Sequence, residues 1–230
     1  MKKENLKRLG IVTLFAIAMA FLESVIVVYI RKMYYPQGFT FPLRGFIDPQ
    51  ILHIEIVREI FTLIMLGCIA ALAAKRFTER FAYFWFCFAV WDIFYYVWLK
   101  VLLGWPQSFL TWDILFLIPW SWASPILAPI ICSCTMLVLA FSIFSLEEKN
   151  KTLTINAKTW SLLIVGALLQ LYTFLYDYGR IILTATEKET LGNIVSAYVP
   201  GTYNWPLFTL GEILILLAIS LLFFKKEKRH

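Results

Sequence analysis

The chain has 230 residues, of which 60% are hydrophobic and only 16% are charged. Soluble domains are typically about 45–50% apolar and about 25% charged, so this composition excludes an ordinary soluble protein. The formal net charge of +6 does not indicate a nucleic-acid partner, because the basic residues gather in short segments between apolar runs and form no basic stripe, zinc knuckle or phosphate loop.

Six apolar runs reach the length of about 20 residues that a helix needs to span a bilayer. We expect a single all-α integral-membrane domain over residues 1–230, a polytopic membrane helix bundle with six transmembrane helices. The expected spans lie at about 10–30, 51–74, 81–103, 123–146, 158–183 and 205–224.

The first apolar run follows a basic start, as in a secretory signal peptide. It continues through Glu23 to Ile30, which is longer than the core of most signal peptides. We therefore expect this segment to be retained as the first span.

The region before the fourth span is apolar for too long to be one helix. Proline at 119, 125 and 129 interrupts it, and proline removes a backbone donor and clashes with the preceding turn. Its tryptophans at 105, 112, 120 and 122 are typical of the headgroup belt. We predict that residues 112–122 form a short interfacial or re-entrant segment.

Lysine and arginine give the orientation. Fourteen of the 21 basic residues fall on one side of the predicted spans, and the positive-inside rule places that side in the cytoplasm. We therefore expect both termini inside (N-in/C-in) and a multi-pass protein of the cell membrane. The fourteen are Lys2, Lys3, Lys7, Arg8, Lys75, Arg76, Arg80, Lys149, Lys151, Lys158, Lys225, Lys226, Lys228 and Arg229.

Five of the predicted helices carry a carboxylate in the outer half of the bilayer, about 9–16 Å from the outer helix ends at 1.5 Å per residue. A carboxylate within the membrane costs several kcal/mol unless it is paired, protonated or hydrated. We expect the five to face a shared polar cavity as catalytic groups, and interhelical salt bridges are the structural alternative. They are Glu23, Glu59, Asp92, Asp177 and Glu212.

Basic and phenolic side chains share helical faces with these acids. The candidates for substrate binding are Arg58, Arg180, Lys100, Tyr95 and Tyr96. An arginine among them would hold an anionic headgroup. Arg58 and Arg180 lie near the water boundary, where structural pairing is the alternative.

The sequence predicts no metal site and assigns no cofactor. It has two histidines, His53 and His230, and no His-Glu-x-x-His motif, whereas zinc and iron prefer imidazole or thiolate ligands. The cysteines, at 68, 87, 132 and 134, lie in apolar spans and are expected to pack there. No Gly-x-Ser-x-Gly elbow is present.

The tripeptide Trp-Asp-Ile occurs twice, at Trp91 and at Trp112. We expect the first copy in mid-helix and the second at an interface, with no common role. The first copy begins the stretch WDIFY, Trp91 to Tyr95, which resembles the Trp-Glu-x-x-Tyr stretch of integral-membrane terpene cyclases over five residues, with aspartate in place of glutamate. That resemblance implies a role for Asp92 in protonating a substrate.

These features favour a membrane-embedded enzyme that acts on a lipid or isoprenoid through carboxylate acid/base chemistry. A small proton- or cation-coupled transporter is the alternative, and a structural subunit of a membrane complex is a third. Transport is disfavoured because no inverted repeat or pair of broken helices is visible. The expected partners are the bilayer and a lipid or isoprenoid ligand, with no nucleic acid.

Overall fold

The computed structural model describes residues 3–43, 48–149, 153–184 and 198–223. Within them the chain forms six long helices and one two-stranded antiparallel sheet. The helices are α1 (Lys3–Tyr34), α2 (Pro49–Ala73), α3 (Phe77–Leu103), α4 (Leu127–Lys149), α5 (Ala157–Thr184) and α7 (Trp205–Phe223).

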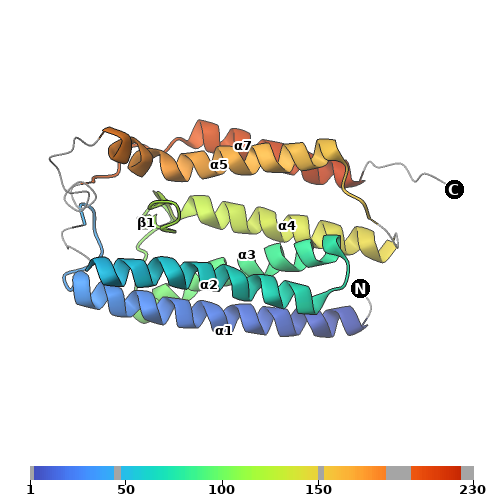
Figure 1. Cartoon of the computed structure of the whole chain (residues 1–230), viewed down its shortest axis with the longest axis horizontal. Helices are drawn as coiled ribbons and strands as arrows, with labels where there is room; N and C mark the ends of the chain where they lie inside the picture. Colours follow the sequence, from blue (N-terminus) through green and yellow to red (C-terminus); the bar gives the residue numbers. More distant parts are fainter. Residues whose placement is uncertain (1–2, 44–47, 150–152, 185–197, 224–230) are drawn as a thin grey trace.

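All six helices are long and apolar enough to cross a membrane, which confirms the prediction of six helices of spanning length and indicates a multi-pass membrane protein. Successive helices run in opposite directions along one axis, so α1 begins and α7 ends at the same end of the molecule (Figure 1). We call this the termini end. We call the opposite end, where the sheet lies, the hairpin end.

Local signals in the sequence explain where two of the helices begin and end. Asp48 precedes α2, and its side chain accepts a hydrogen bond from the Gln50 N–H at 2.7 Å, with Pro49 in the first turn. This arrangement satisfies one of the free donors of a helix start. Gly104 ends α3 in the left-handed conformation, with φ 65°, which glycine adopts without steric strain.

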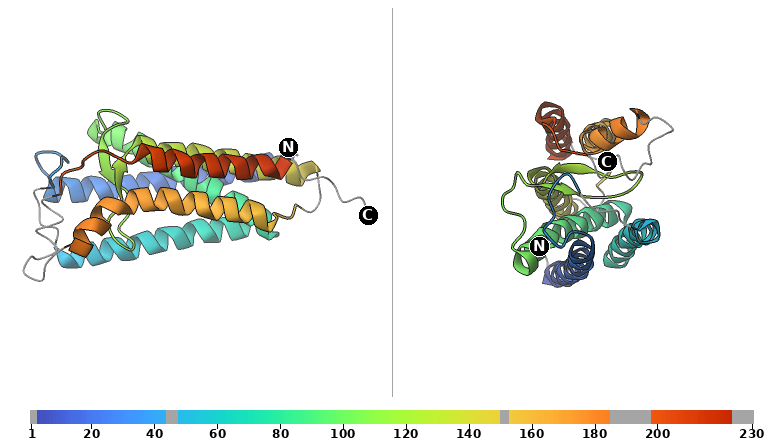
Figure 2. Two further views of the ribbon diagram at one scale, coloured as in Figure 1. Left: turned by 90° about the horizontal axis from the view of Figure 1, so that it is seen from above. Right: turned by 90° about the vertical axis from the view of Figure 1, so that its left-hand side faces the viewer.

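The helices form two groups on either side of α4. On one side α3 packs against α1 and α2, and on the other α5 pairs with α7, as the end-on view of Figure 2 shows. Helix α4 contacts both α3 and α7.

Two glycines allow the close approach of α5 and α7. A Cβ atom built on Gly166 would lie 2.7 Å from the Gly211 carbonyl oxygen, and one on Gly211 would lie 2.8 Å from the Gly166 carbonyl oxygen. Small residues at such contacts let membrane helices pack backbone to backbone.

The segment before α4 forms a β-hairpin. Strand β1 (Trp112–Ile114) pairs antiparallel with β2 (Ala123–Pro125), with Asp113 opposite Ser124. Helix α4 starts at Leu127, four residues later than the predicted span, because the strand occupies residues 123–125. The two strands hydrogen-bond to each other through their backbone groups.

Polar contacts close the termini end. Arg76 binds Glu79 at 2.8 Å and also pairs with Glu147 of α4, which accepts a further hydrogen bond from Thr78 at 2.6 Å. Beneath this cluster lies the main apolar core, which includes Cys87 with no exposed surface.

Candidate functional site

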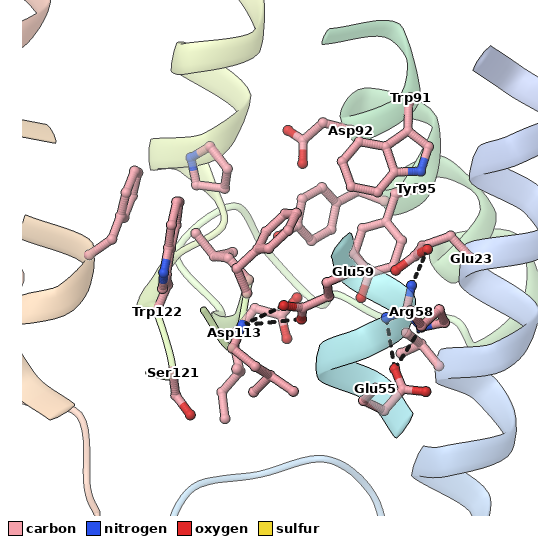
Figure 3. A pocket seen from close by; sticks show the side chains of 18 of the residues that line it. Glu23, Glu55, Arg58, Glu59, Trp91, Asp92, Tyr95, Asp113, Ser121 and Trp122 are labelled. Atoms are coloured by element: carbon pink, nitrogen blue, oxygen red, sulfur yellow. Dashed lines mark hydrogen bonds and ion pairs between the residues drawn. The ribbon is translucent and has the colours of Figure 1, made fainter. Parts of the chain in front are cut away.

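A cavity of about 700 Å³ lies between the two groups of helices. Helices α1 to α5 and the hairpin segment all contribute to its walls (Figure 3). Three of the five predicted catalytic carboxylates line it, namely Glu23, Glu59 and Asp92, together with Arg58, Tyr95 and Tyr96 from the predicted binding residues.

Two walls of the cavity are helices that do not pack against each other. Helix α2 contacts α3 and, at a few positions, α1, whereas α5 contacts α7 and β2. Residues of both α2 and α5 nevertheless line the cavity, so the space between these two helices belongs to the cavity itself.

The lining changes in character along the bundle axis. Toward the termini end it is apolar and aromatic, formed by Leu63, Phe84, Trp85, Phe88, Met136, Ala167 and Leu171. Toward the hairpin end it carries all of the acids and arginines, set among further apolar side chains such as Val27, Ile51 and Leu115. One continuous cavity therefore joins an apolar compartment to a charged one.

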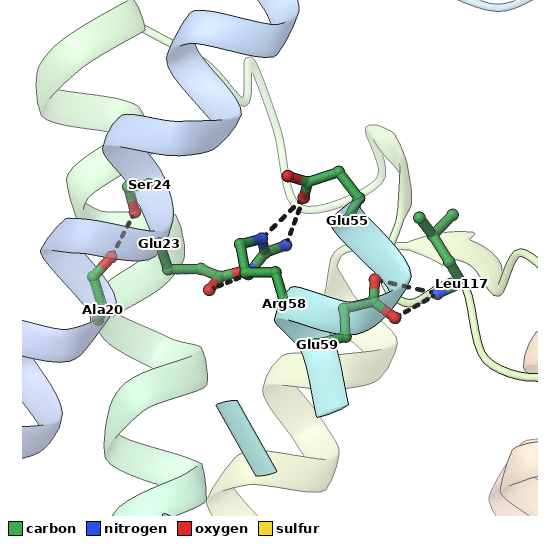
Figure 4. A network of polar contacts seen from close by, with 7 residues as sticks. All are labelled: Ala20, Glu23, Ser24, Glu55, Arg58, Glu59 and Leu117. Carbon is green, nitrogen blue, oxygen red and sulfur yellow. Dashed lines mark hydrogen bonds and ion pairs between the residues drawn. The ribbon is translucent and has the colours of Figure 1, made fainter. Parts of the chain in front are cut away.

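Arg58 stands between two glutamates at the boundary between α1 and α2 (Figure 4). Its Nε donates to Glu55 at 2.7 Å, and its Nη1 donates to Glu23 of α1. Both partners are largely buried, with side chains 13% and 12% exposed. Each nitrogen of the guanidinium thus contacts a glutamate, and the three side chains of this triad together carry a formal charge of −1.

Glu59 contacts the hairpin segment. Both of its carboxylate oxygens accept the Leu117 N–H, at 3.1 and 3.0 Å. The residue is 6% exposed, and among the described residues no cation pairs with it. Its contact joins α2 to the backbone between β1 and β2.

Asp92 lies across the cavity on α3. Its Oδ2 accepts a hydrogen bond from the Ser133 hydroxyl of α4 at 2.7 Å. Within the described part of the chain it has no cationic partner either. The cavity thus holds two carboxylates, from α2 and α3, whose contacts are with a backbone amide and a hydroxyl.

Arg31 and Asp113 form a second ion pair in the cavity wall, which the sequence analysis did not identify. Arg31 Nη2 lies 2.9 Å from Asp113 Oδ1, and the guanidinium stacks 3.8 Å from the Trp105 ring centre and 4.2 Å from that of Phe39. Burial raises the pKa of the Asp113 carboxyl, and the charge of Arg31 opposes that rise. Asp113 Oδ2 has no hydrogen-bond partner in the described structure.

The repeated Trp-Asp-Ile sequence was the one feature that drew attention to Asp113. Asp92 belongs to the first copy and Asp113 to the second, and both line the same cavity. The first copy lies within α3, as expected, and the second lies in strand β1, so the two copies have different local structures but face the same cavity.

Four predicted site residues are not among the described residues that line the cavity. Glu212 lies one layer behind it, where it accepts a hydrogen bond from Gln170 at 2.7 Å and another from Thr135. Gln170 itself lines the cavity, so Glu212 fixes the orientation of that amide.

The other three lie at the hairpin end. Asp177 accepts a hydrogen bond from Tyr198 at 2.6 Å. Lys100 is exposed and donates to the Gly104 and Pro106 carbonyl oxygens at 3.1 and 2.8 Å, which caps α3. Arg180 is exposed near the end of α5.

No group of three or more His, Cys, Asp or Glu side chains that could hold a metal ion occurs in the described part of the chain. Comparison with known proteins gives no further guide, since no protein family, curated protein or solved structure matches the sequence.

Proposed function

We propose that the protein is an integral-membrane enzyme that acts on a lipid or isoprenoid, with the cavity as its active site. The observation that carries this proposal is the joining of an apolar compartment to a charged one in a single cavity. With the termini end in the cytoplasm, the charged compartment lies in the outer half of the bilayer.

The dimensions of the cavity suit an amphiphile. Its volume of about 700 Å³ is in the usual range for small-molecule sites, about 300–1,000 Å³. Its lining on α2 runs from Pro49 to Leu63, about 21 Å along the helix axis. An acyl or isoprenoid chain would lie against the aromatic wall of α3, with its polar end at Glu59 and Asp92.

The separation of α2 from α5 supplies a route of entry. A lipid would pass sideways from the bilayer between these helices and would not need to cross an aqueous surface. The apolar lining residues on these two helices, which include Leu63 and Leu171, would match the chain of the incoming lipid.

Asp92 and Glu59 are the groups that would exchange protons with the substrate. Ser133 engages Oδ2 of Asp92, which orients the carboxyl group and leaves Oδ1 for the substrate. The Leu117 amide orients Glu59 in the same way. Positioned carboxyl groups in a site that excludes bulk water are suited to general acid/base catalysis.

A proton- or cation-coupled transporter is the second candidate. It is favoured by the polar contacts that continue from the cavity through Gln170 to Glu212, between α4, α5 and α7. The apolar lining toward the termini end opposes it, because a transported ion would have to pass that compartment. A structural subunit of a membrane complex would leave the paired polar and apolar compartments without a role.

The test is chemical conversion of a lipid. The purified wild-type protein, Asp92→Asn and the control Asp177→Asn are reconstituted in vesicles of the native membrane lipids, which are then compared by mass spectrometry. We expect a new lipid species with the wild type and the control, and its loss with Asp92→Asn. Lipid extracts that are identical for all three proteins would overturn the enzyme proposal.

A further inference from the structure

We infer that the ligand of the cavity is a cationic amphiphile, an organic ammonium group on an apolar chain. This inference rests on the proposed function for the apolar chain, but its charge follows from the cavity walls alone. It replaces the anionic headgroup that the arginines in the sequence led us to expect.

The charge of the lining is strongly unbalanced. The described cavity wall contains five carboxylates and two guanidinium groups, a formal excess of three negative charges. The excess remains negative even if two of the acids carry a proton. The carboxylates are Glu23, Glu55, Glu59, Asp92 and Asp113, and the guanidinium groups belong to Arg31 and Arg58.

Each arginine already has a carboxylate partner, although Nη1 of Arg31 has no hydrogen-bond partner among the described residues. Arg58 is bound by Glu23 and Glu55. Arg31 is bound by Asp113 and stacks on two aromatic rings. A phosphate or sulfate at either arginine would lie beside the carboxylate already bound there, or would displace it and leave a buried carboxylate without a partner at considerable cost.

A cation, in contrast, would find carboxylates in the cavity that have no cationic partner among the described residues. Glu59 and Asp92 face the cavity without a cation bound to either among the described residues, as Figure 3 shows for their side chains. An ammonium group provides the missing charge and several N–H donors together.

Aromatic rings beside these acids favour an organic cation. Trp91, Tyr95 and Trp122 line the cavity, and Trp122 is held by parallel stacking on Phe174 at 6.0 Å and 7°. Aromatic faces attract ammonium groups, and the attraction is larger where water is excluded. The adjoining apolar compartment would hold an alkyl chain but offers an inorganic ion no ligands.

The experiment compares three ten-carbon probes, decyltrimethylammonium, decyl sulfate and decanol, on the purified full-length protein in a non-ionic detergent. Native mass spectrometry counts the bound probe. We expect the ammonium probe to bind at least about tenfold more tightly than the sulfate, since one neutralised charge pair is worth that factor or more. Equal or preferred binding of the sulfate would overturn the inference.

Variants locate the binding. Glu59→Gln combined with Asp92→Asn should weaken binding of the ammonium probe by about tenfold or more, whereas Asp177→Asn, which changes a carboxylate outside the cavity lining, should leave it unchanged. If the double variant does not fold, the comparison of probes on the wild type still decides the question. If tetramethylammonium or sodium, which lack the alkyl chain, bound as tightly as the ammonium probe, the cavity would be an ion site and the inference of an amphiphile would be refuted.

The outcome is separate from that of the proposed function. Binding of the ammonium probe without conversion of any lipid would leave the ligand class standing and overturn the enzyme. Lipid conversion together with preferred binding of the sulfate would support the enzyme and overturn the cationic ligand.

Discussion

The Ser133 hydroxyl on α4 donates a 2.7 Å hydrogen bond to the Asp92 carboxylate on α3 inside the cavity. This hydrogen bond joins the two helices at the Asp92 carboxylate, which pairs with no cation among the described residues. Asp92→Asn should therefore keep the fold, since an amide oxygen accepts the same hydrogen bond, with a change of about 1 kcal/mol in the free energy of unfolding. Lipid conversion should fall by about 10²–10⁴-fold, the usual contribution of a general acid or base.

Both quantities are measurable on one preparation, by thermal unfolding in detergent and by mass spectrometry of the lipids. Ser133→Ala is the matched variant, because it removes the hydroxyl and keeps the carboxylate. It should reduce conversion less than Asp92→Asn does. A large loss of stability in Asp92→Asn with unchanged conversion would assign Asp92 a structural role.

Arg58 should be more important for stability than for chemistry. Arg58→Gln leaves Glu23 and Glu55 facing each other without the guanidinium, and breaking a buried ion pair in this way costs about 3 kcal/mol. Adding Glu23→Gln to Arg58→Gln should recover part of that loss. Unfolding in denaturant of the wild type, both single variants and the double variant gives the coupling energy, and a coupling near zero would contradict the triad.

The contact between α5 and α7 should not accept a methyl group. Gly166→Ala places its Cβ against the Gly211 carbonyl oxygen and the Ile215 side chain, an overpacking that costs about 1–3 kcal/mol. Gly67→Ala on α2 is the control, because nothing lies within 4 Å of a Cβ built there. The control should be neutral or slightly stabilising, and equal effects of the two substitutions on melting temperature would refute the close approach.

The orientation leads to a prediction about fusion proteins. A reporter active only outside the cytoplasm should be silent after Glu148, at the termini end, and active after Gly201, at the hairpin end. The positive-inside rule gives this direction. The reverse pattern would invert the orientation and place the charged compartment in the inner leaflet.

Access to the cavity can be measured at Ser121, which lines it within the hairpin segment. In a background without the four native cysteines, Ser121→Cys should react with a membrane-impermeant thiol reagent added from outside. An amphiphile bound in the cavity should slow that reaction. Labelling solely from the cytoplasmic side would exclude an outward position for the hairpin.

The six helices were predictable because spanning length is a strong constraint on apolar runs. Their ends were less so. Helix α1 runs from Lys3 to Tyr34, beyond both ends of its apolar run, since a helix does not stop where hydropathy falls. Arg31 therefore extends from the last turn of a helix rather than from a loop, which is why its pairing with Asp113 went unnoticed.

The position of each acid along its helix follows from the sequence, but the direction of its side chain around the helix does not. Glu59 and Glu212 were placed at similar depth, yet one lines the cavity and the other lies a layer behind it. A membrane helix is as apolar toward lipid as toward its neighbours, so hydropathy does not fix its rotation. The hairpin that brings Asp113 to the cavity depends on strand pairing between residues 112–114 and 123–125. A search for apolar runs and helical periodicity does not reveal such pairing.

The contact between Glu59 and the Leu117 N–H gives the molecule an internal reporter. A ligand that draws the Glu59 carboxylate toward itself must release that amide, and a released amide exchanges its hydrogen with solvent faster. Deuterium uptake at Leu117 should therefore rise when the charged compartment is filled and stay low when a ligand occupies the apolar compartment alone. A single backbone position would then show which half of the cavity a bound molecule uses, before any product is known.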